Sequence, residues 1–217
     1  LYYDCENTTL DFCIDDISIT GKKSTVVSED ENNDYLYRFD FENGNETWRP
    51  RGDNRLIRTD EYSHTGSHSI YVTNRTRTWN GPTVNINKVE RGVNYFYSAY
   101  VMYNGENLND SHKMRMEVEY NIDGQAVYQL ITEKEIKKGY WTEISGMYTL
   151  PENAIDVMFH IQTANITDGS VLSATDLMPF YVDTVTVTET SVVHRKTAMK
   201  LFAVLIAGSL LSLGIYG

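Results

Sequence analysis

Apolar and polar residues alternate with a period of two through most of residues 35–188, as they do in strands that bury one face. Turn-forming tracts such as ENGN and NIDG separate the alternating segments, and no helical period intervenes. The pattern predicts an all-β domain, a two-sheet antiparallel β-sandwich. Eight segments carry it: 35–42, 69–74, 95–103, 113–120, 126–131, 140–148, 155–162 and 180–188.

A repeated motif suggests that this domain is one of a series. FCIDDISIT at 12–20 matches FYVDTVTVT at 180–188, and the shared aspartates, at positions 15 and 183, lie 168 apart, about one domain and its linker. We therefore interpret residues 1–20 as the C-terminal strand remnant of a preceding module. The polar, charged segment 21–34 reads as a linker.

The tail at 189–217 leaves the β pattern. Residues 201–217 are uncharged and mostly apolar, behind Arg195, Lys196 and Lys200. That run is slightly shorter than the ~20 residues of a typical membrane span. A membrane anchor, a truncated further domain and an unrelated joined sequence all stay open.

Composition limits the class of partner. The 217 residues have a net charge of -11, with 16 tyrosines and only two cysteines. No basic stripe is available for nucleic-acid binding, so that partner is excluded. Cys5 and Cys13 either pair across a hairpin in an oxidising compartment or lie apart as small buried residues.

The alternation also indicates which side chains share the face away from the core. In 155–162, Ile155, Val157, Phe159 and Ile161 form one face, which leaves Asp156, Met158, His160 and Gln162 on the other. In 126–131 two assignments are possible. One points Val127 and Ile131 inward with Tyr128 outward, and the other points Tyr128 and Leu130 inward.

An outward tyrosine beside planar hydrogen-bonding groups suits a sugar, which has an apolar C–H face and a rim of hydroxyls. Trp79, in the polar tract NRTRTWNG (74–81), either supplies a second aromatic platform or packs over a sheet edge.

Paired carboxylates raise the possibility of glycoside hydrolysis, which needs two of them across a cleft. Glu117 with Glu119, and Glu133 with Glu135, have the spacing that places both on one strand face. However, 113–120 alternates charged and apolar residues like an ordinary solvent face, and 133–138 (EKEIKK) reads as a solvated turn. The pattern favours a non-catalytic domain.

Three tracts carry a resemblance to a known family: FENGNETWRPRG (41–52), HTGSHSIYVTNRTRTWNGP (64–82) and FYVDTVTVT (180–188). In this order and spacing they resemble family 22 carbohydrate-binding modules, over residues 35–188. The resemblance implies a galactose-binding-like jelly roll that is secreted or cell-surface. Its partners would be xylan, or a related β-1,4 or mixed-linkage plant-wall glycan, and an attached glycoside hydrolase. A β-sandwich spacer or protein-contact module is the alternative.

The resemblance also assigns binding residues. Trp79 and Tyr128 would stack on sugar rings, and Arg51 would hydrogen-bond. His160 and Gln162 stand where the family has a tyrosine and a glutamate. Since a charge-assisted hydrogen bond is worth about 1.5–3 kcal/mol against about 1 for a neutral one, Gln162 predicts weaker or altered binding, which Gln162→Glu would strengthen.

Finally, the resemblance implies a structural Ca²⁺ ion away from the sugar site. Its ligands would be the carboxylates of Glu42 and Asp183 with backbone carbonyls of Asp40 and Thr65, oxygen donors of the kind that Ca²⁺ takes. Without the family, Glu42 and Asp183 read as surface carboxylates of an acidic protein.

Overall fold

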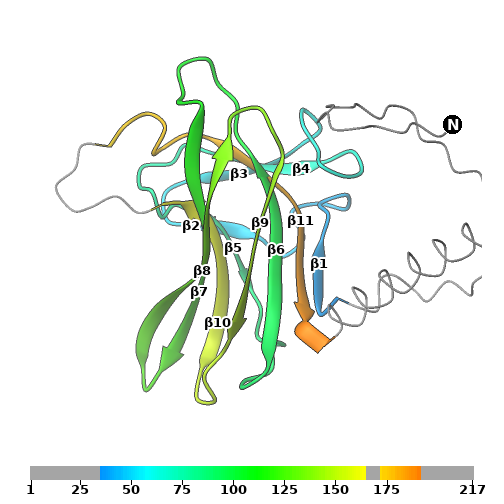
Figure 1. Ribbon diagram of the computed structural model, residues 1–217, viewed down its shortest axis with the longest axis vertical. Coiled ribbons are helices and arrows are strands. Elements are labelled where there is room, and N and C mark those ends of the chain that lie inside the picture. Colours follow the sequence, from blue (N-terminus) through cyan, green and yellow to red (C-terminus); the bar gives the residue numbers. More distant parts are fainter. Residues whose placement is uncertain (1–34, 165–171, 192–217) are drawn as a thin grey trace, which may run out of the picture. The chain divides into compact units, whose positions relative to one another are not determined.

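The computed structural model describes residues 35–164 and 172–191. These residues form two antiparallel sheets (Figure 1). The six-stranded sheet contains β1 (Tyr37–Phe39), β3 (Arg55–Thr59), β4 (Ser69–Thr73), β6 (Asn94–Met102), β9 (Thr142–Thr149) and β11 (Phe180–Glu189). The five-stranded sheet contains β2 (Arg49–Arg51), β5 (Gly81–Asn85), β7 (Ser111–Ile122), β8 (Gln125–Lys137) and β10 (Ile155–Thr163).

The strand order shows a sandwich rather than a simple meander. One sheet runs β3-β4-β11-β6-β9, with β1 also paired to β11, and the other runs β2-β5-β10-β7-β8. β1 and β11, the first and last strands, therefore lie side by side, joined through pairs such as Phe39 and Val185. The predicted all-β, two-sheet antiparallel fold is confirmed.

Large aromatic side chains bridge the two sheets in the core. Phe159 on β10 lies 5.6 Å, centroid to centroid, from Tyr97 on β6, and 6.0 Å from Trp48, all of them buried. Val157, Phe159 and Ile161 are fully buried as the alternation predicts. Ile155 is not: it is 56% exposed, because the strand is irregular between Ile155 and Met158 and Asp156 has a φ of 54°.

The pattern missed three short strands and misread one long one. β2, β3 and β5 have no more than five residues each and, unlike the five-residue β4, show little alternation of apolar and polar residues, so no period of two marks them. The charged segment 133–138, expected to be a turn, belongs almost entirely to β8, where Ile136 is buried and Glu133 pairs with Arg115. Its charged residues therefore extend a strand.

Several sequence predictions lie outside the described residues. They are the strand remnant at 1–20 with Cys5 and Cys13, the linker at 21–34, and the tail beyond Ser191. Within 35–164 and 172–191, no helix has the length and apolarity needed to cross a membrane.

Candidate functional site

The outer face of the five-stranded sheet carries most of the predicted binding residues, in rows set by strand register. One row runs from β2 to β8 through Arg49, Thr83, His160, Glu117 and Leu130. The next row joins Met158, Glu119 and Tyr128. Tyr128 is 51% exposed while Val127 and Ile131 pack against the core, so the assignment with Tyr128 outward is confirmed.

Arg51 lies between two exposed aromatic rings. Its guanidinium carbon is 5.4 Å from the ring centroid of Trp79 and 5.3 Å from that of Tyr128, both distances typical of cation–π contacts. Trp79 is 42% exposed and Tyr128 51%. The structure thus brings three of the predicted residues, from β2, β8 and the loop before β5, into one group that we call the Arg51 cluster.

His160 and Gln162 lie on this face but beneath its surface. They are 2% and 0% exposed, so the expectation that they face solvent is wrong. Gln162 Oε1 accepts a hydrogen bond from Arg51 Nη1 at 2.7 Å, and the Gln162 side chain also hydrogen-bonds Glu117. His160 Nε2 lies 2.9 Å from Glu119 Oε2. Both residues therefore contact the groups that cover them.

Burial shifts the pKa values of the ionisable side chains that lie beneath the Arg51 cluster. Desolvation, followed by the positive charges of Arg51 and Arg49, lowers the pKa of His160 to about 3. The imidazole is therefore neutral at pH 7, and its contact with Glu119 is a hydrogen bond donated to a carboxylate rather than an ion pair. Burial likewise raises the pKa of Glu117, although Arg115, 2.9 Å away, opposes the shift.

Glu119 is a member of the site that sequence reasoning missed. Its carboxylate accepts a hydrogen bond from the Tyr128 hydroxyl at 3.2 Å, contacts His160, and lies 3.9 Å from Arg51 Nε. The Glu119 side chain is 27% exposed. Alternation placed it on a charged outer face, but only strand register shows that it stands opposite Tyr128.

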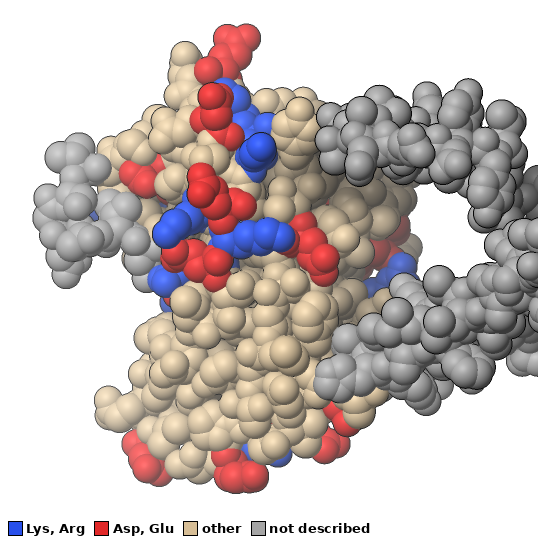
Figure 2. Space-filling model, in the orientation of Figure 1, with Lys and Arg blue, Asp and Glu red and all other residues tan. Residues whose placement is uncertain are grey.

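Charges of both signs are interleaved around the cluster. Glu133 Oε1 is 3.1 Å from Lys113 Nζ, and Glu133 Oε2 is 3.3 Å from Arg115 Nε. The face seen in Figure 2 shows the same mixing, with acidic and basic side chains side by side across its middle. No extended basic surface suited to nucleic acid is visible there.

The Trp79 loop is tightly organised. Asn80 Oδ1 accepts hydrogen bonds from the backbone N–H groups of Thr76 and Arg77. The ring of Trp79 lies against Gly52, where an added Cβ would collide with the Trp79 ring and the Asn80 side chain. Gly52 also has a φ of 69°, so the residue at this turn needs both the freedom and the small size of glycine.

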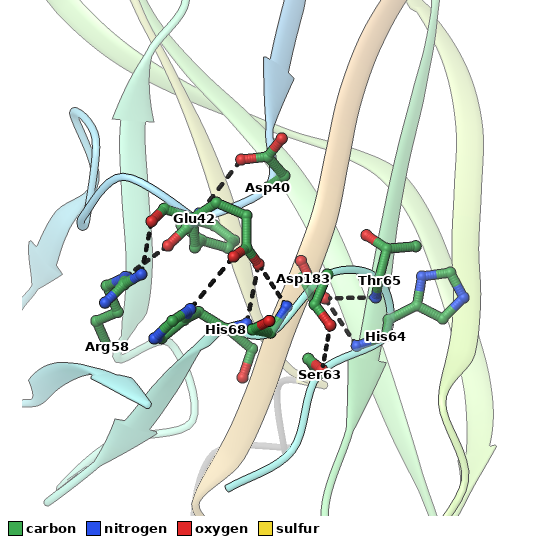
Figure 3. Close-up of polar contacts among 12 residues, drawn as sticks. Asp40, Glu42, Arg58, Ser63, His64, Thr65, His68 and Asp183 are labelled. Carbon is green, nitrogen blue, oxygen red and sulfur yellow. Dashed lines mark hydrogen bonds and ion pairs between the residues drawn. The ribbon is translucent and has the colours of Figure 1, made fainter. Parts of the chain in front are cut away.

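The proposed calcium ligands gather around the 63–68 loop (Figure 3). Glu42 Oε1 accepts hydrogen bonds from the N–H groups of Ser67 and His68, at 2.8 and 2.9 Å. Asp183 Oδ2 accepts from the N–H groups of His64 and Thr65, at 2.7 and 3.0 Å. Asp183 is fully buried, so neither it nor the half-buried Glu42 is a free surface carboxylate.

The oxygen atoms available at this loop are ligands that suit a hard cation such as Ca²⁺. Burial raises the pKa of Asp183, and no ion pair to it occurs among the described residues. Desolvation raises the pKa of Glu46, and the charges of Asp40 and Asp183 add to the shift. Negative charge is thus concentrated here, although Arg58, which donates to the Phe41 and Glu42 carbonyls, and His68, 3.2 Å from Glu42, lie beside it. The described residues contain no group of three or more acidic, His or Cys side chains poised around a metal, so carbonyl ligands would be needed.

Comparisons with known proteins assign the chain to a family. A family model described as "Carbohydrate binding domain" matches residues 33–168. Endo-1,4-beta-xylanase A of Thermotoga maritima is 27% identical over 198 residues, which cover 90% of this chain and 17% of that protein. The xylanase/beta-glucanase of Ruminococcus flavefaciens is 28% identical over 140 residues, covering 63% of this chain and 17% of that one. The chain thus spans about a sixth of these curated relatives.

Solved structures share the fold. The CBM22-2 xylan-binding domain of Paenibacillus barcinonensis Xyn10C has a TM-score of 0.65 and 25% identity, over 71% of this chain and 99% of that one. The CBM22-1–GH10 modules of a Clostridium thermocellum xylanase, complexed with xylohexaose, give 0.62 and 25%, over 72% and 28%. The jelly-roll prediction is confirmed by these matches.

Proposed function

Because this chain belongs to the carbohydrate binding domain family and has the fold of family 22 modules, we propose that it is a non-catalytic module that binds xylan or a related plant-wall glycan. The observation that carries the proposal is the Arg51 cluster: two half-exposed aromatic rings flank one guanidinium on the outer face of the five-stranded sheet. The domain resembles the xylan-binding domains, and its cluster has the chemistry that a sugar chain requires.

Stacking on Trp79 and Tyr128 supplies most of the binding energy in this proposal. A ring that covers the C–H face of a sugar removes apolar surface from water, at roughly 25 cal/mol per Å². A hydrogen bond to a sugar hydroxyl replaces one made to water, so its net contribution is smaller. The two rings set where the chain lies, and the polar groups between them select its hydroxyls.

Arg51 and Glu119 are the polar groups placed to contact a glycan. Arg51 donates and Glu119 accepts, and both side chains keep some exposure, 16% and 27%. Glu119 would supply the carboxylate that Gln162 lacks. His160 and Gln162, predicted to bind sugar directly, act in this proposal from below, by holding Glu119 and Arg51 in place.

Affinity electrophoresis in xylan-containing gels tests the proposal. Wild-type protein should be retarded, whereas Trp79→Ala and Tyr128→Ala should migrate as in gels without xylan. Tyr140→Ala is the matched control, because Tyr140 is 68% exposed but lies on the turn between β8 and β9, outside the cluster. It should be retarded like the wild type. A wild-type protein that runs unretarded in both xylan and mixed-linkage glucan would favour the spacer or protein-contact alternative.

We further propose that the module belongs to a secreted or cell-surface enzyme and directs an attached glycoside hydrolase to its polysaccharide. The curated relatives support this, since they are named as xylanases and the chain matches only a small part of each. One matched structure joins such a module to a GH10 domain. Mass spectrometry of the intact native protein would test it: a native mass equal to this chain alone would contradict the proposal.

A structural Ca²⁺ ion is the last part of the proposal. Glu42 and Asp183 would provide carboxylate oxygens, and Asp40 and Thr65 backbone carbonyls. Phe41 and Glu42 are not included as carbonyl ligands, because their carbonyls already accept hydrogen bonds from Arg58. When bound, the ion would neutralise the charge concentrated on Asp183, Asp40 and Glu46 and tie β11 to the 63–68 loop, without touching the sugar.

A further inference from the structure

Arg75 is a buried arginine whose contacts point to a role in the glycan site, although it lies outside the Arg51 cluster. It is 6% exposed, and all five of its guanidinium N–H groups can be accounted for by acceptors. Nε donates to the carbonyl of Asn80 at 2.8 Å and Nη2 to the carbonyl of Thr78 at 2.7 Å. These two carbonyls belong to the residues immediately before and after Trp79.

The remaining donors of Arg75 anchor the loop to the rest of the sandwich. Nη2 also donates to Thr163 Oγ1 at the end of β10, at 2.7 Å. Nη1 donates to the carbonyls of Met178 and Asp176, at 2.8 and 3.3 Å, in the segment before β11. Its guanidinium carbon also lies 5.0 Å from the Phe180 ring centroid. One side chain therefore joins the Trp79 loop to two other parts of the chain.

This arrangement requires the planar fork of arginine. A lysine has three donors on one nitrogen, so it could not reach carbonyls on both sides of Trp79 and the acceptors of β10 together. Burial lowers the pKa of Arg75 to about 10, which leaves it charged at neutral pH. It contacts carbonyl and hydroxyl oxygens rather than carboxylates, as expected of a residue that fixes backbone.

We propose that Arg75 is a positioning residue for Trp79: it sets the orientation of the aromatic platform, and hence glycan affinity, without touching the glycan. The inference rests on the proposed function only where affinity is concerned. The orientation of Trp79 can be measured with no glycan present, so the two ideas can fail separately.

The test uses protein labelled with 5-fluorotryptophan, which gives one ¹⁹F signal for each of Trp48, Trp79 and Trp141, assigned by Trp→Phe variants. Arg75→Lys should shift or broaden the Trp79 signal while those of Trp48 and Trp141 stay, and xylan affinity should fall at least about tenfold. Arg77→Lys is the matched control. Arg77 lies in the same loop, is exposed, and its side chain has no hydrogen bond or ion pair within the described residues. It should change neither readout.

Unchanged Trp79 fluorine resonance in folded Arg75→Lys would overturn the proposal, and so would equal changes at all three tryptophans, which would indicate a merely structural role. If Arg75→Lys does not fold, Thr163→Val carries a milder form of the test: it removes one acceptor of Arg75, together with the hydrogen bonds of the Thr163 hydroxyl to the Thr78 and Asp176 carbonyls. If wild-type protein binds no xylan but the Trp79 signal still responds selectively, the positioning role stands and the proposed function fails.

Discussion

At the scale of single residues, the hydroxyl of Tyr97 is an unusual feature of the core. Tyr97 is fully buried on β6, and its hydroxyl has no hydrogen-bond partner in the part of the chain that the structure describes. Burial raises its pKa well above the usual value for tyrosine. An unsatisfied buried hydroxyl costs free energy that an apolar ring would not.

Tyr97→Phe should therefore increase the free energy of unfolding by about 1 kcal/mol, because it removes the hydroxyl and keeps the ring contact with Phe159. Tyr103→Phe is the matched control. Tyr103 is also fully buried, but its hydroxyl donates to the Asn109 carbonyl at 2.8 Å, so its loss should cost about 1 kcal/mol. Urea unfolding curves measure both. Destabilisation by Tyr97→Phe would show that its hydroxyl has a partner after all.

Gln162 shows why a residue's face does not determine its role. The alternation places it correctly opposite the core, but Arg51 and Glu117 cover it. Long charged side chains can lie over shorter polar ones, and their conformations are not encoded in strand periodicity. Gln162→Glu would thus create a buried carboxylate rather than a new sugar contact.

We expect Gln162→Glu to lower the free energy of unfolding by about 1–3 kcal/mol at pH 7, because Glu117 loses a donor and gains a like charge, a cost that the hydrogen bond from Arg51 offsets only in part. The added like charge would raise the pKa of Glu117 further in the folded state. The folded protein then takes up that proton first, so the deficit should shrink as the pH falls from 7 towards 5. Thermal denaturation at several pH values checks this. Gln129→Glu, which places the same charge at an exposed β8 position, should keep the unfolding free energy of the wild type. A Gln162→Glu variant that is more stable and binds xylan more tightly would instead support the expectation, drawn from the sequence, that this change strengthens binding.

At the scale of elements, long strands were predictable and the short ones that complete the site were not. β7, β10 and β11 have clear alternation, whereas β2, which carries Arg51, has three residues including a proline. The β7–β8 hairpin, closed by the Asp123–Gly124 turn, sets Tyr128 opposite Glu119, but β2 and β10 join this sheet from distant parts of the chain. Pairing register depends on hydrogen bonds between distant segments, so one strand's pattern cannot reveal it.

The turn between β2 and β3 offers a test of how backbone supports the platform. Gly52 and Gly124 both have positive φ, 69° and 78°, so alanine at either site should cost about 1 kcal/mol. Only at Gly52 would the new Cβ meet Trp79 and Asn80, since Gly124 has nothing within 4 Å. Gly52→Ala should therefore lose xylan retardation and Gly124→Ala keep it. Equal retardation of the two folded variants in affinity gels would mean that the Trp79 ring can move aside without loss of xylan binding.

At the scale of the whole molecule, the sandwich and its core were predictable because they depend on period and polarity, while the sites depend on side chains from distant strands. Trp79, Tyr128 and Arg51 were assigned through family resemblance, and the structure adds Glu119 and Arg75, which no local pattern distinguishes. The calcium ligands also came from resemblance. What the structure contributes there is the fully buried negative charge of Asp183, which has no ion pair within residues 35–164 and 172–191.

That charge leads to a prediction about global stability. An ion that binds only the folded state stabilises it by about 2.7 kcal/mol at 100 times its Kd, which for a domain of this size raises Tm by roughly 5–10 °C. Ca²⁺ should produce such a rise over EDTA in calorimetry, and Mg²⁺ much less, because Mg²⁺ demands stricter octahedral geometry. Asp183→Asn should remove the response, while Glu106→Gln, which changes an exposed carboxylate, should keep it. Identical Tm values in Ca²⁺ and EDTA would leave Glu42 and Asp183 as anchors of the 63–68 loop through its N–H groups alone, since those hydrogen bonds need no metal.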